Sequence, residues 1–250
     1  MTLEAGPRVR ILPAGESALV IELGDAIDPG LNQQVYELAT AIERASVPGV
    51  QELIPTYRSL LVRYDPLRTG FAEMARNFEQ MAAAAVSARP HREDRRFVFE
   101  VPVAYGGADG PDLPEVARHA GLTEEEVIGH HTFPTYRVYM LGFAPGFPYL
   151  GGLDPRIACP RLKTPRTRVP VGSVGIAEQQ TGIYPLATPG GWQIIGRTPA
   201  PLFRPDHEPP VAIMPGSFMR FVRVSAEEAD AVRDLVHDGR YEIPVRRRGF

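Results

Sequence analysis

Five basic side chains lie close together between residues 156 and 168, and no acidic residue separates them. They are Arg156, Arg161, Lys163, Arg166 and Arg168. Prolines recur at positions 155, 160, 165 and 170, and each fixes its own φ at about −65°. A guanidinium group on a stiff backbone suits a carboxylate or a phosphate, because it offers a planar pair of donors. The stretch therefore predicts an anion-binding surface. The alternative is a solvent-exposed loop whose charges bind no ligand and only favour solubility.

A second group of candidate residues surrounds the single tryptophan, Trp192. Gly190 and Gly191 precede it, and Gln193 and Arg197 follow it. Bare glycine backbone beside an indole can wall a pocket for a small ligand, with peptide N–H groups as donors. The alternative is a tight hairpin whose tryptophan belongs to the core. We take these residues, together with the last four cations above, as the candidate site for a small anionic substrate.

The other residues with reactive side chains lack the neighbouring motif residues that a catalytic or metal site would need. The chain has no glycine-rich phosphate loop, no dinucleotide-binding G-x-G-x-x-G and no G-x-S-x-G nucleophile elbow. No metal site is expected, because no ligand spacing occurs and the adjacent His130 and His131 face different directions on a predicted helix. We expect His131 to be structural, with donation into a pocket as its alternative. Ser173 has no evident base and Cys159 suggests a buried thiol, so no catalytic residue is assigned.

The composition limits the class of protein. The chain has 250 residues, of which 44% are hydrophobic and 23% charged, as in an ordinary globular protein with a core. A net charge of −3 gives no general attraction to nucleic acid or to an anionic membrane. No run of about 18 apolar residues predicts a membrane span, and the first residues lack the apolar centre of a secretory signal. A single cysteine excludes an internal disulfide and suits the cytoplasm, where we expect the protein.

Hydrophobic periodicity predicts a small α+β domain in the first third of the chain. Strands are expected at residues 17–23, 50–57 and 59–64, and amphipathic helices at residues 31–45 and 71–86. This order predicts an α+β sandwich with helices on one face of a sheet. A charged stretch with a proline follows, and it indicates a boundary between domains of residues 1–92 and 93–250.

The second domain changes character in residues 142–216, which contain 14 prolines and 11 glycines among aromatic and β-branched residues. Short strands joined by tight turns fit this composition, as in an all-β barrel. Residues 142–152, GFAPGFPYLGG, are expected to form a rigid loop anchored by Phe143, Phe147 and Tyr149, because proline and glycine disfavour both helix and strand.

Three pairs with capping-box spacing predict where helices begin in this domain. They are Asp112 with Glu115, Thr123 with Glu126, and Ser225 with Glu228.

Longer motifs carry a resemblance to a known family. They are LPAGESALVIELG near the start, VPVAYGGADGPDLPEVARHAGLTEEEVIGHHT in the middle, VYMLGFAPGFPYLGGL and KTPRTRVPVGSVGIAEQQTGIYPLATPGGWQIIGRT in the proline-rich part, and PPVAIMPGSFMRFV near the end. Together they resemble allophanate hydrolase subunit 1, the carboxyltransferase subdomains C and D. That family includes the B-type component of bacterial ATP-dependent 5-oxoprolinase and an inhibitor of a sporulation histidine kinase. The resemblance implies an N-terminal α+β domain and a C-terminal cyclophilin-like β-barrel.

The resemblance also implies a function. It favours a subunit of ATP-dependent 5-oxoprolinase, which opens 5-oxo-L-proline to L-glutamate with two partners. The first partner is the C-type component of 5-oxoprolinase, similar to allophanate hydrolase subunit 2, and the other is a third subunit. The chain alone is then inactive, and ATP belongs to the complex because this chain has no nucleotide motif. The alternatives are a carboxyltransferase subunit of a biotin-dependent urea or amide carboxylase and a non-enzymatic inhibitor of a histidine kinase. Arg204 and Ser217 stand where the family usually has aspartate, which puts any site at that edge in doubt.

Overall fold

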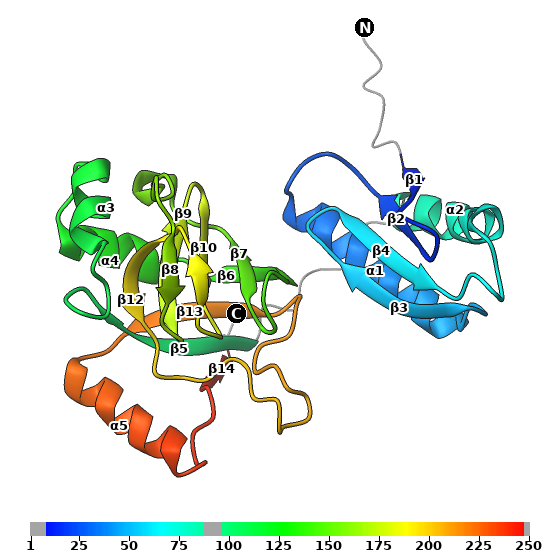
Figure 1. Cartoon of the computed structure of the whole chain (residues 1–250). Coiled ribbons are helices and arrows are strands. Elements are labelled where there is room, and N and C mark those ends of the chain that lie inside the picture. The colour runs from blue at the N-terminus through cyan, green and yellow to red at the C-terminus, as the bar shows by residue number, and fades with distance from the viewer. Residues whose placement is uncertain (1–8, 88–96, 248–250) are drawn as a thin grey trace, which may run out of the picture. The chain divides into compact units, whose positions relative to one another are not determined.

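The structure of the chain is a computed structural model that describes residues 9–87 and 97–247. It divides into two compact units, Met1–Glu93 and Asp94–Phe250, each with its own hydrophobic core (Figure 1). The boundary that the sequence predicts, after residue 92, lies outside the described residues.

A four-stranded antiparallel sheet forms the basis of the N-terminal unit. Its strands are β1 (Arg10–Pro13), β2 (Ala18–Glu22), β3 (Val50–Pro55) and β4 (Ser59–Tyr64), in the order β1-β2-β4-β3. The three strands that periodicity predicts are confirmed. The sequence analysis does not predict β1, because its four residues are mostly exposed at the edge of the sheet and show no apolar alternation.

Two amphipathic helices, α1 (Pro29–Ala45) and α2 (Phe71–Ser87), cover one face of this sheet. Val35, Leu38 and Ile42 of α1 are buried against alternate apolar residues of β2 and β4. Each large apolar side chain buried in this way contributes about 1.5–3 kcal/mol to folding. The predicted α+β sandwich is confirmed.

A closed β-barrel forms the C-terminal unit. Its strands are β5 (Phe97–Tyr105), β6 (Tyr136–Leu141), β7 (Pro148–Gly151), β9 (Ser173–Ala177), β10 (Gln180–Ile183), β12 (Gln193–Arg197) and β13 (Phe218–Arg223). They follow one another in the order β12-β9-β10-β7-β6-β13-β5, and β12 pairs with β5 to close the ring. Valine, isoleucine and aromatic side chains fill the core. The predicted barrel is confirmed.

Smaller elements surround the barrel. A separate ribbon pairs β8 (Arg166–Val169) with β11 (Thr188–Gly190), and β14 (Val245–Arg247) pairs with β5. The helices are α3 (Leu113–Ala120), α4 (Glu124–Thr132) and α5 (Ala226–His237), and Figure 1 shows α3 and α4 next to each other. A short 3-10 turn, η1 (Pro155–Ile157), follows β7.

The helix caps test three predictions. The capping boxes that begin at Thr123 and Ser225 are confirmed, because each hydroxyl accepts the N–H of the glutamate three residues later. The box predicted at Asp112 is wrong, because its carboxylate makes no hydrogen bond to the start of α3.

The prediction that residues 142–152 form a loop throughout is also wrong. Residues Pro148–Gly151 form β7, which pairs with β6 and β10. Pro148 occupies the first position of the strand, where a missing N–H is tolerated. Gly151 allows close packing, because a Cβ there would lie 1.9 Å from the ring of Tyr139.

Candidate functional site

A pocket of about 240 Å³ opens in the C-terminal unit, and we call it the aromatic pocket. Its lining residues are Phe143, Phe147, Tyr149, Arg161, Pro165, Tyr184, Pro189, Gly190, Gly191 and Trp192. They come from the β6–β7 connection and β7, from the segment before β8, and from the chain between β10 and β12. The fold therefore brings together three separate stretches of the C-terminal unit.

Aromatic rings in edge-to-face contact form the walls. The centroid of the Phe147 ring lies 5.3 Å from Tyr184 and 5.4 Å from Trp192, with interplanar angles of 86° and 89°. Such pairs contribute about 0.5–1.5 kcal/mol each beyond the area they bury. All three side chains are also buried in one apolar cluster. Trp192 is therefore both a core residue, as the alternative interpretation holds, and a wall of the pocket.

Phe143 is the exposed ring at the rim. Its side chain is 65% exposed, so the prediction that it anchors the segment is wrong, whereas Phe147 is 2% exposed. Its backbone has φ 64°, in the left-handed region that bulky residues rarely adopt. The Phe143 ring still touches Phe147 edge to face, with centroids 5.6 Å apart.

Arg161 contributes the positive charge of the pocket. Its Cζ lies 6.0 Å from the centroid of the Trp192 ring, at the outer limit of a cation–π contact. Within residues 9–87 and 97–247, no carboxylate forms an ion pair with Arg161. Its guanidinium donors are therefore open to solvent or to a ligand.

The residues on both sides of Arg161 are hydrogen-bonded to Gly191 and to Gln193, the first residue of β12. Leu162 N–H donates to Gly191 O at 2.7 Å, and Gln193 Nε2 donates to Pro160 O at 2.9 Å. Gln193 is 6% exposed and does not line the pocket. Gln193 therefore lies outside the pocket lining, and its hydrogen bond to Pro160 holds the segment that carries Arg161.

Tyr184 supplies a hydroxyl to the pocket. Its N–H donates to Ser173 O at 2.9 Å, and its carbonyl accepts from Gly172 N–H at 2.7 Å. Burial raises the pKa of Tyr184, while the nearby backbone N–H of Trp192 and the charge of Arg161 oppose the rise. The hydroxyl is therefore protonated at neutral pH.

Arg166 points toward Asp112 and does not line the pocket. Its Nη2 donates to Asp112 Oδ1 at 2.6 Å, and Asp112 Oδ2 accepts the N–H of Ile194 at 2.6 Å. Arg166 Nη1 also reaches the carbonyl of Trp192 at 3.4 Å. Arg166 and Asp112 therefore support the strand behind Trp192.

The remaining predicted cations are not gathered at the pocket. Lys163 and Arg168 are exposed and lie outside its lining. Arg197 Nε donates to the carbonyl of Val171 at 2.8 Å, and this residue also lies outside the lining. From the predicted row, the structure brings Arg161 to the glycines and the tryptophan, and it distributes the others elsewhere.

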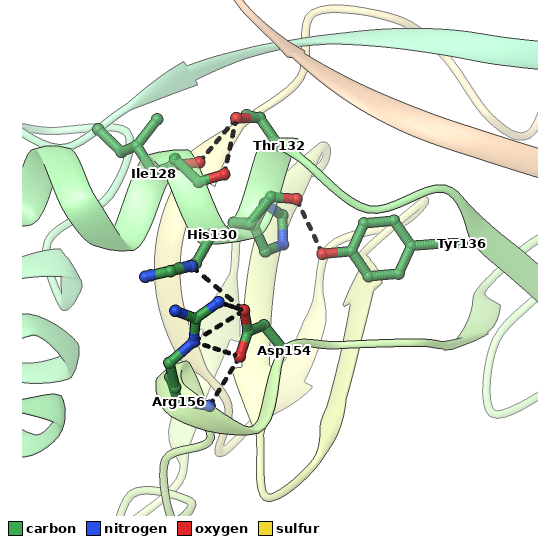
Figure 2. A network of polar contacts seen from close by, with 8 residues as sticks. Ile128, His130, Thr132, Tyr136, Asp154 and Arg156 are labelled. Carbon is green, nitrogen blue, oxygen red and sulfur yellow. Dashed lines mark hydrogen bonds and ion pairs between the residues drawn. The ribbon is translucent and has the colours of Figure 1, made fainter.

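Arg156, the first cation of the row, belongs to a different cluster. It folds back on Asp154, with Nη2 and Oδ2 2.6 Å apart, while His130 Nδ1 approaches the same carboxylate at 3.1 Å (Figure 2). The hydrogen bonds from Arg156 lower the pKa of Asp154 to about 2. This cluster fixes the 3-10 turn after β7.

His131 is structural, and the alternative that it donates into a pocket is wrong. It is completely buried, and its Nε2 lies 2.9 Å from Thr181 Oγ1. Because Thr181 Oγ1 donates its proton to Gly175 O at 3.0 Å, Nε2 must carry the imidazole proton. Nδ1 then accepts from the hydroxyl of Tyr105 at 2.7 Å. Burial lowers the pKa of His131 to about 3.

Four other residues from the sequence analysis also lie outside the pocket lining. Cys159 is 2% exposed and burial raises its pKa, which confirms a buried thiol. Ser173 is equally buried, so it is not an exposed nucleophile. Arg204 and Ser217 donate turn hydrogen bonds through their backbone N–H groups, at 2.7 and 3.2 Å.

Two larger hollows, of about 700 and 610 Å³, combine fewer chemical features. The first has no aromatic lining residue, and the second borders Tyr105, whose hydroxyl is already bonded to His131. Within the described ranges, no cluster of three His, Cys, Asp or Glu side chains could hold a metal ion. No helix described by the structure has the length and apolar character needed to cross a membrane.

The sequence analysis missed Tyr184 as a pocket residue and took Phe147 and Tyr149 only as anchors. A weak signal for Tyr184 existed, because it lies just before Pro185 and a few residues before the paired glycines. Phe147 and Tyr149 lie in a segment of alternating rings and turn residues, which suits a wall as well as an anchor.

Known proteins resemble this chain in both sequence and fold. The model of the family described as carboxyltransferase domain, subdomain C and D, matches residues 9–213. The B subunit of 5-oxoprolinase from Bacillus subtilis (strain 168) is 45% identical over 237 residues, which cover 91% of this chain and 98% of that protein. A conserved uncharacterized protein of Pyrococcus horikoshii, PH0987, has a crystal structure that covers 88% of this chain and 99% of its own, with 48% identity and a TM-score of 0.53.

A more distant likeness concerns the fold alone. The crystal structure of the Kluyveromyces lactis urea carboxylase covers 97% of this chain and 24% of its own, with 22% identity and a TM-score of 0.76. The motifs, the two units and the matched residues agree, and the chain belongs to the family of carboxyltransferase domains, subdomains C and D.

Proposed function

We propose that this protein is the B-type subunit of an ATP-dependent 5-oxoprolinase, which opens 5-oxo-L-proline to L-glutamate together with partner subunits. Three relatives, each named as the B subunit of a 5-oxoprolinase, support the proposal at 45%, 41% and 39% identity. The alignments cover 86–91% of this chain and 96–98% of those proteins.

The observation that carries the proposal is the position of Arg161 beside the aromatic pocket. 5-Oxoproline is a five-membered ring with one carboxylate and one lactam carbonyl. A guanidinium group binds a carboxylate through two parallel hydrogen bonds, and aromatic walls contact the CH₂ groups of the ring. Pockets for drug-sized ligands have volumes of about 300–1,000 Å³. The 240 Å³ of this pocket therefore suit a smaller ligand.

ATP belongs to the complex in this proposal. A lactam is a poor electrophile, and phosphorylation of its oxygen creates a better one. We assign the nucleotide to a site outside the aromatic pocket, because the pocket is small and the chain lacks a phosphate loop. A C-type second subunit of related architecture and a third subunit complete the enzyme in the cytoplasm, and the isolated chain is inactive.

The experiment that tests the proposal is reconstitution. The chain is co-expressed with the C-type and third subunits, and glutamate formed from 5-oxoproline and ATP is measured for the complex and for each subunit alone. We expect glutamate from the complete complex with ATP and none from this chain alone. A complete complex that forms no glutamate would overturn the function, and turnover by the isolated chain would overturn its dependence on partners.

A second candidate is a carboxyltransferase subunit that acts on urea or a similar small amide. The fold shared with the Kluyveromyces lactis urea carboxylase favours it. In a parallel assay, urea and bicarbonate are supplied with ATP, a biotin carboxylase and a biotinyl carrier. Carboxylated urea from this mixture, with no glutamate from 5-oxoproline, would select the second candidate.

A further inference from the structure

We propose that Tyr184 determines ligand specificity in the aromatic pocket: its hydroxyl donates a hydrogen bond to the carbonyl oxygen of a compact ring whose carboxylate is bound by Arg161. The choice of ligand, a five-membered lactam acid, rests on the proposed function. The inference adds a contact that neither the family match nor the names of the relatives assign.

The hydrogen bonding of Tyr184 leaves its proton available. The backbone N–H of Trp192 lies next to the hydroxyl oxygen, and a phenol can donate its own proton to another group at the same time. No acceptor for this proton is found within the part of the chain that the structure describes. Because Tyr184 lines the pocket, a ligand oxygen is a suitable partner for it.

The hydroxyl is also held in place. The Tyr184 ring meets the rings of Phe147 and Trp192 nearly at right angles, at centroid distances of 5.3 and 6.3 Å. Its backbone N–H is bonded to Ser173, the first residue of β9, and its C=O to Gly172 in the turn before that strand. A donor fixed in this way loses little conformational entropy when a ligand binds.

Gly190 supports the same interpretation. A Cβ built at this position would lie 2.4 Å from Tyr184 Oη, and two ring carbons would be 2.9 Å away. A side chain at Gly190 would therefore displace the hydroxyl. The absence of a side chain keeps the phenol close to the backbone that borders the pocket.

Arg161 and Tyr184 complement the two polar groups of the ligand. They reach the pocket from different segments, and they are close enough for the Arg161 charge to influence the phenol. In 5-oxoproline, the carboxylate and the carbonyl are attached to the two ring carbons that flank the nitrogen. A ring among the aromatic walls can therefore present its carboxylate to Arg161 and its carbonyl oxygen to Tyr184.

The binding of three ligands distinguishes the Arg161 contact from the Tyr184 contact. They are 5-oxoproline, cyclopentanecarboxylate, which lacks the carbonyl, and 2-pyrrolidinone, which lacks the carboxylate. Binding to the full chain is followed by the fluorescence of Trp192, its single tryptophan, and binding to the reconstituted complex by calorimetry. The same titrations are made with Tyr184→Phe and Arg161→Ala. Tyr184→Phe retains the ring and removes the hydroxyl.

We expect Tyr184→Phe to weaken binding of the two carbonyl ligands by about twofold to tenfold, and to leave cyclopentanecarboxylate unchanged. Arg161→Ala should weaken binding of the two carboxylate ligands by about tenfold to a hundredfold and leave binding of 2-pyrrolidinone unchanged. Equal losses for all three ligands with Tyr184→Phe, no loss for any of them, or no binding to chain or complex would overturn the inference.

Turnover separates this inference from the proposed function. If the complex forms glutamate and Tyr184→Phe changes neither KM nor ligand binding, the inference is rejected and the proposed function is retained. Binding with the expected selectivity, in a complete complex that makes no glutamate, rejects the function and retains the contact.

Discussion

The guanidinium of Arg166 and the carboxylate of Asp112 lie 2.6 Å apart, and this ion pair joins β8 to the residue that precedes α3. The second carboxylate oxygen accepts the N–H of Ile194 in β12, also at 2.6 Å. Asp112 is 9% exposed, so both interactions are largely shielded from water. One carboxylate thus connects β8 of the ribbon to β12 of the barrel.

Replacement of Arg166 should reduce stability. Arg166→Ala leaves one oxygen of the buried Asp112 without a partner, which costs about 1–3 kcal/mol. The measurement is the free energy of unfolding from urea titration. Arg168→Ala is the matched control, because this arginine lies on the same strand, is exposed, and should change stability by less than about 0.5 kcal/mol. Equal effects of the two substitutions would contradict a supporting role for the ion pair.

Replacement of Arg161 should impair substrate binding by the complex. Arg161→Ala removes a charge-assisted interaction worth about 1.5–3 kcal/mol, which corresponds to a KM for 5-oxoproline higher by about tenfold to a hundredfold. The measurement is steady-state glutamate formation by the reconstituted complex. Arg156→Ala removes the same charge from the cluster with Asp154 and should leave KM within about twofold. A comparable rise in KM for both variants would show that general charge, and not the Arg161 contact, sets the affinity.

The two pocket glycines should differ in their tolerance of a methyl group. Gly190→Ala places Cβ 2.4 Å from Tyr184 Oη, and the buried ring cannot move away freely, so overpacking should cost about 1–3 kcal/mol. At Gly191 the nearest atom to a new Cβ is 3.5 Å away, which is an ordinary contact. Thermal unfolding of both variants tests this difference. Equal melting temperatures would mean that the Tyr184 ring can rearrange.

Acid should destabilise the C-terminal unit through His131. Its pKa is about 3 in the folded protein because of burial, whereas an unfolded histidine has a pKa of about 6.5. Between these values the unfolded state binds one proton more, so stability falls as pH decreases from about 6.5 toward 3, by at most about 1.4 kcal/mol per pH unit. Urea titrations from pH 7 to 4.5 measure the slope.

The control for this effect is His131→Gln, which cannot titrate. It should be less stable at pH 7, because Tyr105 or Thr181 loses a hydrogen bond, but its stability should depend less on pH. The difference between the two slopes isolates His131 from the carboxylates. Parallel slopes would mean that His131 does not carry the acid sensitivity.

Local sequence patterns are enough to predict most of the elements and the fold class. The burial pattern of a helix or strand repeats over a few neighbouring residues, so periodicity located α1, α2 and most strands of the N-terminal unit. The density of proline and glycine in residues 142–216 indicated short strands and turns. Long motifs indicated the family. The row of cations pointed to Arg161, and the glycines beside the single tryptophan pointed to Gly190, Gly191 and Trp192, and these four residues line one pocket.

The partners of individual side chains depend on the folded structure. Asp112 has the local spacing of a helix cap, yet its carboxylate bonds to Arg166 and Ile194, which are 54 and 82 positions away. The guanidinium and the strand N–H each take one oxygen of this carboxylate, and the bond to the guanidinium is charge-assisted on both sides. Tyr184 likewise enters the pocket because strand pairing brings it to Trp192. Such contacts depend on which strands become neighbours, and local sequence patterns do not contain that information.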